Sequence, residues 1–387
     1  MDFDFMAYFV NINEQMNYAR NNFQRPTYDA FALTDRLFIK NFRLSKEITQ
    51  YLINLLKPYI VVDSQLSSID IQTKVLVALN FFATGSYQTS VGNSRLMNLS
   101  QSSVCRCVKK VVAALNQPEI FNTRVKFPSN IQELDEVRNE FYKKTGFASV
   151  IGCLDCTHVA IVSPSKNLNL VENQYPEYMY VNRESYHSIN VQYLCDSNLK
   201  ILNVNALFPG STHDVHIWNN SNVSIMLEEL HAHNYSDYFL LGDSGYPLRP
   251  WLLTPIAQPT TAAEENYNKN QMHVRSVIER CNGVLKSKSR CLLKDRVLHY
   301  KPEKATAIIN ACIVLHNMCI EHNIAEIIDE TLEDFDLGMY QNQEPLNEHV
   351  NDNRNRNLML GRRQRDRIVG FLVSTKSKFT TRIINCM

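Results

Sequence analysis

The chain has 387 residues, 44% of them hydrophobic and 20% charged, a composition typical of a globular protein with two or three domains and not of a disordered chain. No apolar run approaches the ~20 residues of a membrane span, and the chain begins with acid where a secretory signal would carry positive charge. Ten cysteines without framework spacing predict reduced thiols in a protein of the nucleus and cytoplasm.

The net charge of +1 hides four strongly charged regions. Seven Lys or Arg stand against two acids over 64–129, and nine stand against three over 275–304. Eight acids without any Lys or Arg fill 326–348, and eight basic residues against one acid follow over 354–378. Three basic patches are typical of a protein that binds a polyanion, although any one patch fits a solvated face equally well.

The N-terminal part is predicted to be helical. Residues 1–30 show no periodicity and are expected to form a loosely ordered arm. A helical domain over 31–130 follows, with one helix capped by Ser45 and a second that runs from Asp70 to a stop at Gly85.

Residues 86–115 predict a helix-turn-helix within this domain. A short helix over 88–97 and a turn would precede a long helix capped by Ser100, with Val104, Val108 and Val111 facing inward. Many helical bundles contain such a turn without touching DNA, so the structural alternative stays open. If the motif binds DNA, the side chains that meet groove edges and phosphates would be Gln101, Ser102, Arg106, Lys109 and Lys110.

A second domain is predicted over 131–325. A strand over 149–155, a hairpin of two strands (188–195 and 201–208) and a helix from Gly210 through Leu227 come first. A strand over 238–242, a short strand over 251–253, a helix with Glu279 and a last helix over 302–323 follow. This order predicts an α/β domain with a ribonuclease-H-like fold.

The last residues, 326–387, are predicted to form an acidic linker of weak order and a basic tail. Within the tail, 358–372 should form an amphipathic helix that is interrupted at its glycines. Residues 362–365 are a weak nuclear-localisation signal.

Three carboxylates stand at the ends of these elements. Asp155 ends the first apolar run, Asp243 ends another, and Glu279 lies at the edge of the apolar stripe of its helix. A strand-end Asp alone is more often a turn residue, but three acids brought together would repel one another unless a cation neutralised them. Such hard oxygen ligands suit two ions of Mg²⁺ or Mn²⁺, which can hydrolyse a phosphodiester.

Five segments resemble the PIF/harbinger transposases and the harbinger transposase-derived nucleases of animals: 153–161, 209–214, 241–248, 277–280 and 315–317. The resemblance spans about 41–323 and implies a DDE nuclease. Asp155 would then bridge two metal ions, with Asp243 and Glu279 holding one each. It also implies a Myb-like (SANT or trihelix) partner for DNA binding and nuclear entry. Asn282 and Ser289 depart from the family pattern, because aromatic residues are usual at both positions.

Further residues are candidates for the site. Arg280, Lys286 and Lys288 are predicted to contact the DNA backbone. His158, His213 and Asp214 are candidates for lining the cleft, although each also fits a hydrogen-bonded structural role.

Three functions fit these features. The first is an active endonuclease or transposase that cuts double-stranded DNA. The second is a catalytically idle DNA-binding or chromatin adaptor, and the third is a scaffold for the Myb-like partner. The presence of all three acids favours the first; a homo-oligomer stays open in each case.

Overall fold

The structure is a computed structural model that describes residues 29–60, 69–165, 175–324 and 352–384, with side chains in the last range described for 356–374. The arm predicted over 1–30 therefore lies almost entirely outside the described residues, and so does the acidic segment 326–348.

The N-terminal part is helical, as predicted. The predicted cap of α3 is confirmed, because Ser45 accepts from the Ile48 N–H, and α4 starts at the predicted place, where the Asp70 side chain accepts from the Thr73 N–H. Gly85 ends α4 with φ +61, a left-handed backbone that glycine adopts without strain. The elements are η1 (Ala30–Ala32), α2 (Asp35–Phe42), α3 (Lys46–Leu56), α4 (Ile71–Thr84), α5 (Gln88–Gly92), α6 (Gln101–Leu115), α7 (Pro118–Arg124) and α8 (Ile131–Thr145).

Helix α5 is shorter than the helix predicted over 88–97. It ends at Gly92, and the chain folds back so that the Leu99 N–H donates to the Gly92 carbonyl. A Cβ at Gly92 would lie 2.3 Å from the Leu99 carbonyl oxygen, so this turn depends on the missing side chain. Helix α6 begins at its predicted cap, Ser100.

The apolar face of α6 is as predicted, since Val104, Val108 and Val111 are buried. Its polar side chains are at the surface: Gln101, Ser102, Arg106 and Lys109 are exposed and Lys110 is half-buried. The DNA-binding role of this helix pair stays a prediction.

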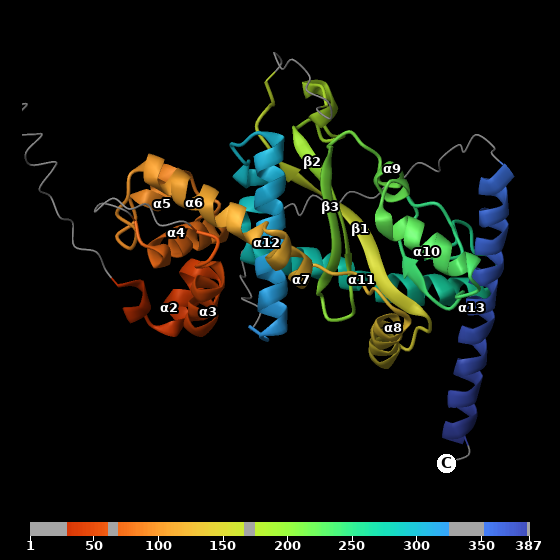
Figure 1. Ribbon diagram of the computed structural model, residues 1–387. Coiled ribbons are helices and arrows are strands. Elements are labelled where there is room, and N and C mark those ends of the chain that lie inside the picture. Colours follow the sequence, from red (N-terminus) through yellow and green to blue (C-terminus); the bar gives the residue numbers. More distant parts are fainter. Residues whose placement is uncertain (1–28, 61–68, 166–174, 325–351, 385–387) are drawn as a thin grey trace, which may run out of the picture.

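The second part is built on one five-stranded sheet in the order β3-β2-β1-β4-β5 (Figure 1). β1 pairs antiparallel with β2, and β2 with β3, whereas β4 and β5 run parallel to β1. These are the order and directions of the ribonuclease-H-like fold expected from the sequence. The strands are β1 (Val150–Ala160), β2 (Ser188–Cys195), β3 (Ile201–Pro209), β4 (Phe239–Leu241) and β5 (Leu252–Leu253).

Helices cover both faces of the sheet. α11 packs on the face of β1 that carries Cys153, whose thiol contacts the Val274 carbonyl, and Leu154 points to the other face, into a second core with Trp218 and Leu227. The helix expected from Gly210 through Leu227 is two helices, because Ser221 caps a new start. The elements here are η2 (Glu177–Tyr180), α9 (Asp214–Asn219), α10 (Asn222–Ala232), α11 (Ala262–Lys288), η3 (Arg290–Leu292), η4 (Lys294–Arg296) and α12 (Pro302–Glu321).

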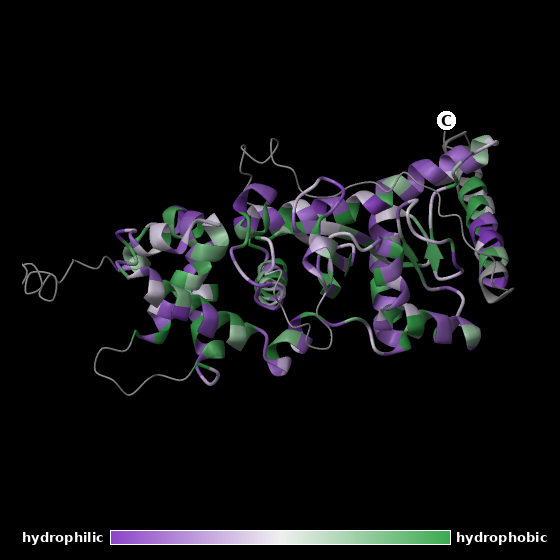
Figure 2. Cartoon of the chain, turned by 90° about the horizontal axis from the view of Figure 1, so that it is seen from above, coloured by the Kyte–Doolittle hydropathy of each residue, from purple (hydrophilic) through white to green (hydrophobic). Residues whose placement is uncertain are grey.

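The tail forms one continuous helix, α13 (Asp352–Ile384), and the predicted interruption at its glycines is wrong. Gly361 lies against the Arg249 backbone, where a Cβ would come within 3.0 Å, and Ile368 is buried. The helix therefore gains packing against α11 and β5 that outweighs the low helix propensity of glycine. Figure 2 places α13 at the opposite end of the molecule from α2–α6, with hydrophobic and hydrophilic residues alternating along it.

Within the described residues, no helix combines the length and the apolar character that a membrane crossing requires.

Candidate active site

The sequence placed Asp155 at the end of its strand. In the structure, Asp155 lies in the middle of β1. The strand continues to Ala160 because its second half pairs with β2 alone, after the last parallel pair with β4 at Cys153. Asp155 thus stands just beyond the parallel part of the strand, where sites of open α/β sheets gather. It is buried, and one carboxylate oxygen accepts from the Cys156 N–H at 2.8 Å.

Asp243 follows the neighbouring strand β4 by two residues. Its carboxylate accepts from the Gly245 N–H at 3.0 Å, and the preceding Gly242 carbonyl accepts from the buried Gln271 amide of α11 at 2.8 Å. The turn that carries Asp243 is therefore fixed both by its own backbone and by α11.

Glu279 comes from α11, which starts with a capping box of Thr261 and Glu264. The Glu279 side chain is 50% exposed, so it lies at the open side of the group. Its neighbour Arg280, predicted to contact DNA, is also exposed.

One guanidinium joins these acids. Arg275 donates to Asp155 at 2.7 Å and to Glu279, one helical turn further along α11, at 2.6 Å. Asp243 is close enough to interact with the same charge. No role was predicted for Arg275 from the sequence. Its one signal there is the four-residue spacing from Glu279, which puts both side chains on one helix face.

Burial changes the acidity of this group. Desolvation raises the pKa of Asp155 to about 7, opposed by Arg275 and reinforced by Asp243. Desolvation also raises the pKa of Asp243, with a further contribution from Asp214. Two neighbouring carboxyl groups that ionise reluctantly need more positive charge than one guanidinium supplies.

The donor set fits a hard divalent cation, because its oxygens come from three carboxylates that share the charge of a single guanidinium. As the side chains lie, however, no three of the described His, Cys, Asp or Glu residues are close enough together to hold a metal ion. Arg275 occupies the space between Asp155 and Glu279 instead.

The three cleft-lining candidates share a separate small cavity of about 30 Å³: His158, His213 and Asp214. Asp214 accepts from the Asn190 amide at 2.8 Å, and Asn190 pairs with His158 on the sheet face away from α11. His158 contacts the Ser188 hydroxyl at 3.0 Å. The Asp214 charge nevertheless raises the pKa of both Asp155 and Asp243.

Two of the cations predicted to contact DNA are buried, and that prediction is corrected. Lys286 is fully buried and donates to the Thr157 hydroxyl at 2.9 Å and the His158 carbonyl at 3.2 Å. Lys288 is 4% exposed and points to the Ile324 carbonyl. The sequence predicted that α11 would be buried along one apolar stripe. In the structure, the C-terminal half of α11 is buried on nearly all sides, which includes the positions of Lys286 and Lys288.

The two departures from the family pattern, Asn282 and Ser289, are both buried. They stand where larger aromatic side chains were expected, Asn282 in the enclosed half of α11 and Ser289 at its C-cap.

Comparison with known proteins identifies the family. Residues 154–317 match the model of the DDE superfamily endonucleases, a range that includes Asp155, Asp243 and Glu279. The human protein HARBI1, a nuclease by name, is 36% identical over 303 residues, which cover 77% of this chain and 82% of HARBI1. The chain belongs to the harbinger transposase-derived DDE endonucleases.

Other relatives are more distant. HARBI1 of Xenopus laevis is 31% identical over 79% of this chain and 84% of its own, and an ALP1-like protein of Arabidopsis thaliana is 26% identical over 78% and 74%. Among solved structures, a chain of a pre-cleavage Mos1 transpososome is matched over 81% of this chain and 94% of its own, with 14% identity and a TM-score of 0.19. A score that low carries no argument about fold.

Proposed function

We propose that this DDE endonuclease cuts double-stranded DNA with two divalent metal ions held by Asp155, Asp243 and Glu279. The observation that carries the proposal is the Arg275 guanidinium, which contacts Asp155 and Glu279 and interacts with Asp243, where burial raises the pKa of both aspartates. Perturbed acids that share one charged partner are typical of active sites.

Each acid would have its own part in holding the ions, which would be Mg²⁺ or Mn²⁺. Asp155 and Asp243, each fixed by a backbone contact, would hold the ions together with Glu279. When bound, the two ions supply the activation of water and the stabilisation of the leaving oxygen of a phosphodiester. The half-exposed Glu279 lies on the side from which DNA would approach.

Arg275 has a separate part in the proposal. It donates to both Asp155 and Glu279 in the metal-free protein, so its single positive charge reduces the repulsion between the two acids. A carboxylate oxygen that accepts a hydrogen bond from the guanidinium cannot at the same time be a full ligand of a metal ion. Ion binding would therefore require Arg275 to give up at least one of its two hydrogen bonds.

Nicking of supercoiled duplex DNA, with Mg²⁺ and then with EDTA, tests the proposal. The wild type should nick only with Mg²⁺. Asp155→Asn should lower the rate at least about 100-fold, the loss that disturbed outer-shell partners of a metal site already cause. Glu279→Gln should do the same, whereas Glu265→Gln, an exposed acid on the same helix, should not. DNA binding without nicking in the wild type would instead favour the idle adaptor.

Direct DNA contact by α6 belongs to the same proposal. Arg106 and Lys109 are exposed on the side of α6 opposite its buried valines, which is the arrangement that a DNA-facing helix needs. A Myb-like partner that docks on these helices would compete for the same face.

A further inference from the structure

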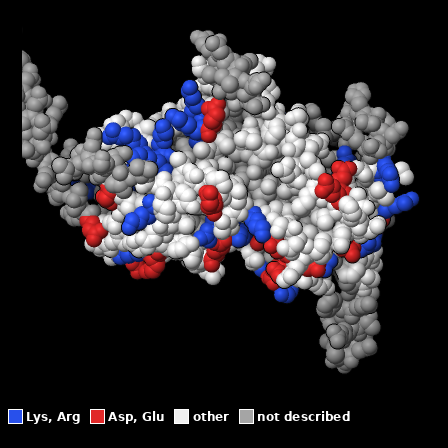
Figure 3. Space-filling model, viewed as in Figure 1, with Lys and Arg blue, Asp and Glu red and all other residues white. Residues whose placement is uncertain are grey.

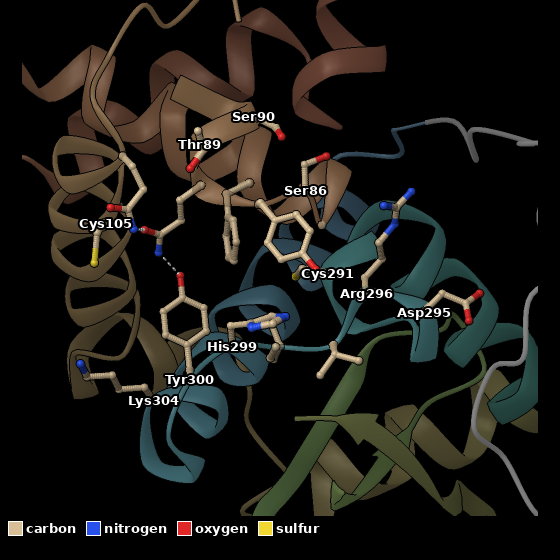
Figure 4. Close-up of a pocket in the computed structure, with 17 residues that line it drawn as sticks. Ser86, Thr89, Ser90, Cys105, Cys291, Asp295, Arg296, His299, Tyr300 and Lys304 are labelled. Atoms are coloured by element: carbon tan, nitrogen blue, oxygen red, sulfur yellow. Dashed lines mark hydrogen bonds between the residues drawn. The ribbon is translucent and has the colours of Figure 1, made fainter. Parts of the chain in front are cut away.

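A large cavity lies away from the three acids, between the N-terminal helices α4–α6 and the segment from η3 to the start of α12 (Figure 4). Its volume is about 580 Å³, within the range of small-molecule sites. One wall comes from the end of α4, from α5 and from the start of α6. The other comes from residues 291–300 and the start of α12.

The two walls are fixed relative to each other. Gly85 lets the end of α4 approach η3 closely, since a Cβ there would lie 2.9 Å from the Arg290 carbonyl oxygen and the Cys291 backbone. Across the cavity, the Gln88 amide donates to the Tyr300 hydroxyl at 2.6 Å. The site is therefore formed before any ligand arrives, which lowers the cost of binding.

The lining offers flat rings beside hydrogen-bonding amides. Tyr87 is 69% exposed and meets the His299 ring edge-on at 5.3 Å, so one of its faces is open to a ligand. The Gln101 side-chain amide donates to the Gln88 side-chain oxygen Oε1 at 3.0 Å, which leaves the Gln101 side-chain oxygen and the Tyr300 O–H for a ligand. Rings for stacking, next to one acceptor and one donor, suit a planar heterocycle with polar edges.

The rim is positively charged. Arg296 and Lys304 are exposed at opposite ends of the cavity, and neither pairs with an acid in the described part of the chain. Asp295 is the only acid among the lining residues that the structure describes. Figure 3 shows Lys and Arg gathered over α5, α6 and the start of α12, so a ligand with phosphates on both sides of its heterocycle fits this rim better than an apolar peptide.

The cavity wall is also connected to β1, the strand that carries Asp155. β1 ends at Ala160, and the next residue, Ile161, forms a parallel bridge with Leu298 of the cavity wall. Ile161 is six residues from Asp155, about 20 Å along an extended strand. A single DNA molecule can therefore span both places.

We infer that this cavity binds one unpaired nucleobase of the DNA substrate, stacked on Tyr87 and held by Arg296 and Lys304 through its flanking phosphates. The inference rests on the proposed function only in taking DNA as the substrate; it needs neither metal nor cleavage. A base turned out of the duplex here would hold the DNA in one register relative to Asp155.

Binding measured in EDTA tests the inference without any cleavage. Two fluorescent DNAs are compared with the full-length protein: a paired duplex, and the same duplex with one unpaired base in its centre. Tyr87→Ala should weaken binding of the second about tenfold and leave the first unchanged, because stacking on an aromatic ring requires a free base face. Tyr178→Ala is the matched control, since Tyr178 is 70% exposed but lies outside the cavity.

Zero-length crosslinking gives a second measurement. A 5-iodouracil at the unpaired position should crosslink on irradiation to Tyr87, His299 or Tyr300, identified by mass spectrometry. An adduct confined to other residues, or equal losses for both DNAs in Tyr87→Ala, would overturn the inference. Unchanged affinity for both DNAs would overturn it too and leave the cavity to a peptide of a partner protein. A failure of the nuclease proposal would show differently, as absent nicking with base binding intact.

Discussion

Arg275 shows how much of the candidate site depends on a residue that is neither a proposed ligand nor on a strand. It is buried, and its two terminal nitrogens each contact a different acid. A guanidinium is suited to this because its donors form a rigid fork, which a lysine ammonium cannot reproduce.

Replacing Arg275 separates its charge from its geometry. Arg275→Gln should lower the free energy of unfolding of the metal-free protein by up to about 3 kcal/mol, because removal of one partner leaves buried charge uncompensated. Arg275→Lys should cost less. Thermal denaturation with and without Mg²⁺ measures both, and Mg²⁺ should raise the melting temperature of Arg275→Gln more than that of the wild type. An equal rise in both would mean that the ions and Arg275 do not compete.

The raised pKa of Asp155 gives a prediction about pH. The folded protein holds this proton up to about pH 7, whereas the ordinary pKa is 3.8, so the folded state binds more protons between these values. Stability from this group is therefore present below pH 4 and is lost as pH rises through 7. Without metal, the melting temperature of Asp155→Asn minus that of the wild type should increase from pH 5 to pH 8. Asp366→Asn, at an exposed position of α13, should show no such trend; a trend of the opposite sign would contradict the burial of Asp155.

At the scale of single residues, the sequence predicted that Asp155 and Asp243 would lie on neighbouring strands, but it did not predict their surroundings. Asp155 and Asp243 follow apolar runs that become adjacent parallel strands, so their proximity was predictable. Arg275 was not, because its contact with Asp155 joins residues 120 positions apart. Lys286 was misread because the enclosure of α11 comes from elements distant in sequence.

Secondary structure elements whose signal is local agree best with prediction. The hairpin of β2 and β3 follows from alternating apolar residues around one turn, and α3 and α4 follow from their capping side chains. The predicted length of α5 and the predicted interruption of α13 were wrong. Each feature depends on a glycine that packs closely against the backbone of a residue outside its helix: Gly92 against Leu99, and Gly361 against Arg249.

The glycines of α13 give a matched pair for testing its docking. Gly361→Ala places a Cβ 3.0 Å from the Arg249 backbone and should loosen the helix, although alanine has the higher helix propensity. Gly370→Ala meets nothing within 4 Å and should stabilise α13 by about 0.5–1 kcal/mol. Hydrogen exchange over 356–374 should become faster in the first variant and slower in the second. Slower exchange in both variants would mean that Gly361 does not pack against the Arg249 backbone.

At the scale of the molecule, charge counts along the sequence overstate the surface available for DNA. The region 275–304 contains nine basic residues, but Arg275, Lys286 and Lys288 are buried in internal contacts. The exposed cations over α5, α6 and the start of α12 are the better candidate for a DNA-binding face (Figure 3).

Three cations of α6 test this face. Replacing Arg106, Lys109 and Lys110 by Ala should weaken duplex binding and flatten its log–log salt dependence by up to about three units. The fold should persist, because Arg106 and Lys109 are exposed and Lys110 is half-buried, and surface charges contribute at most about 1 kcal/mol each. Binding isotherms at two salt concentrations measure the slope, with Lys126→Ala/Lys143→Ala, two exposed cations outside α6, as control. An unchanged slope with loss of a Myb-like partner would mean that α6 docks protein and not DNA.

The continuity of β1 has a consequence for where the enzyme would cut. An extended strand has no slack, and β1 stays paired with β2 as far as Ala160, so the ~20 Å between Asp155 and the Ile161–Leu298 bridge is a length set by covalent geometry. At 3.4 Å per nucleotide, it corresponds to about six nucleotides of one DNA strand. β1 would act as a molecular ruler: the position of the unpaired base would determine the scissile phosphate, whatever the sequence between them.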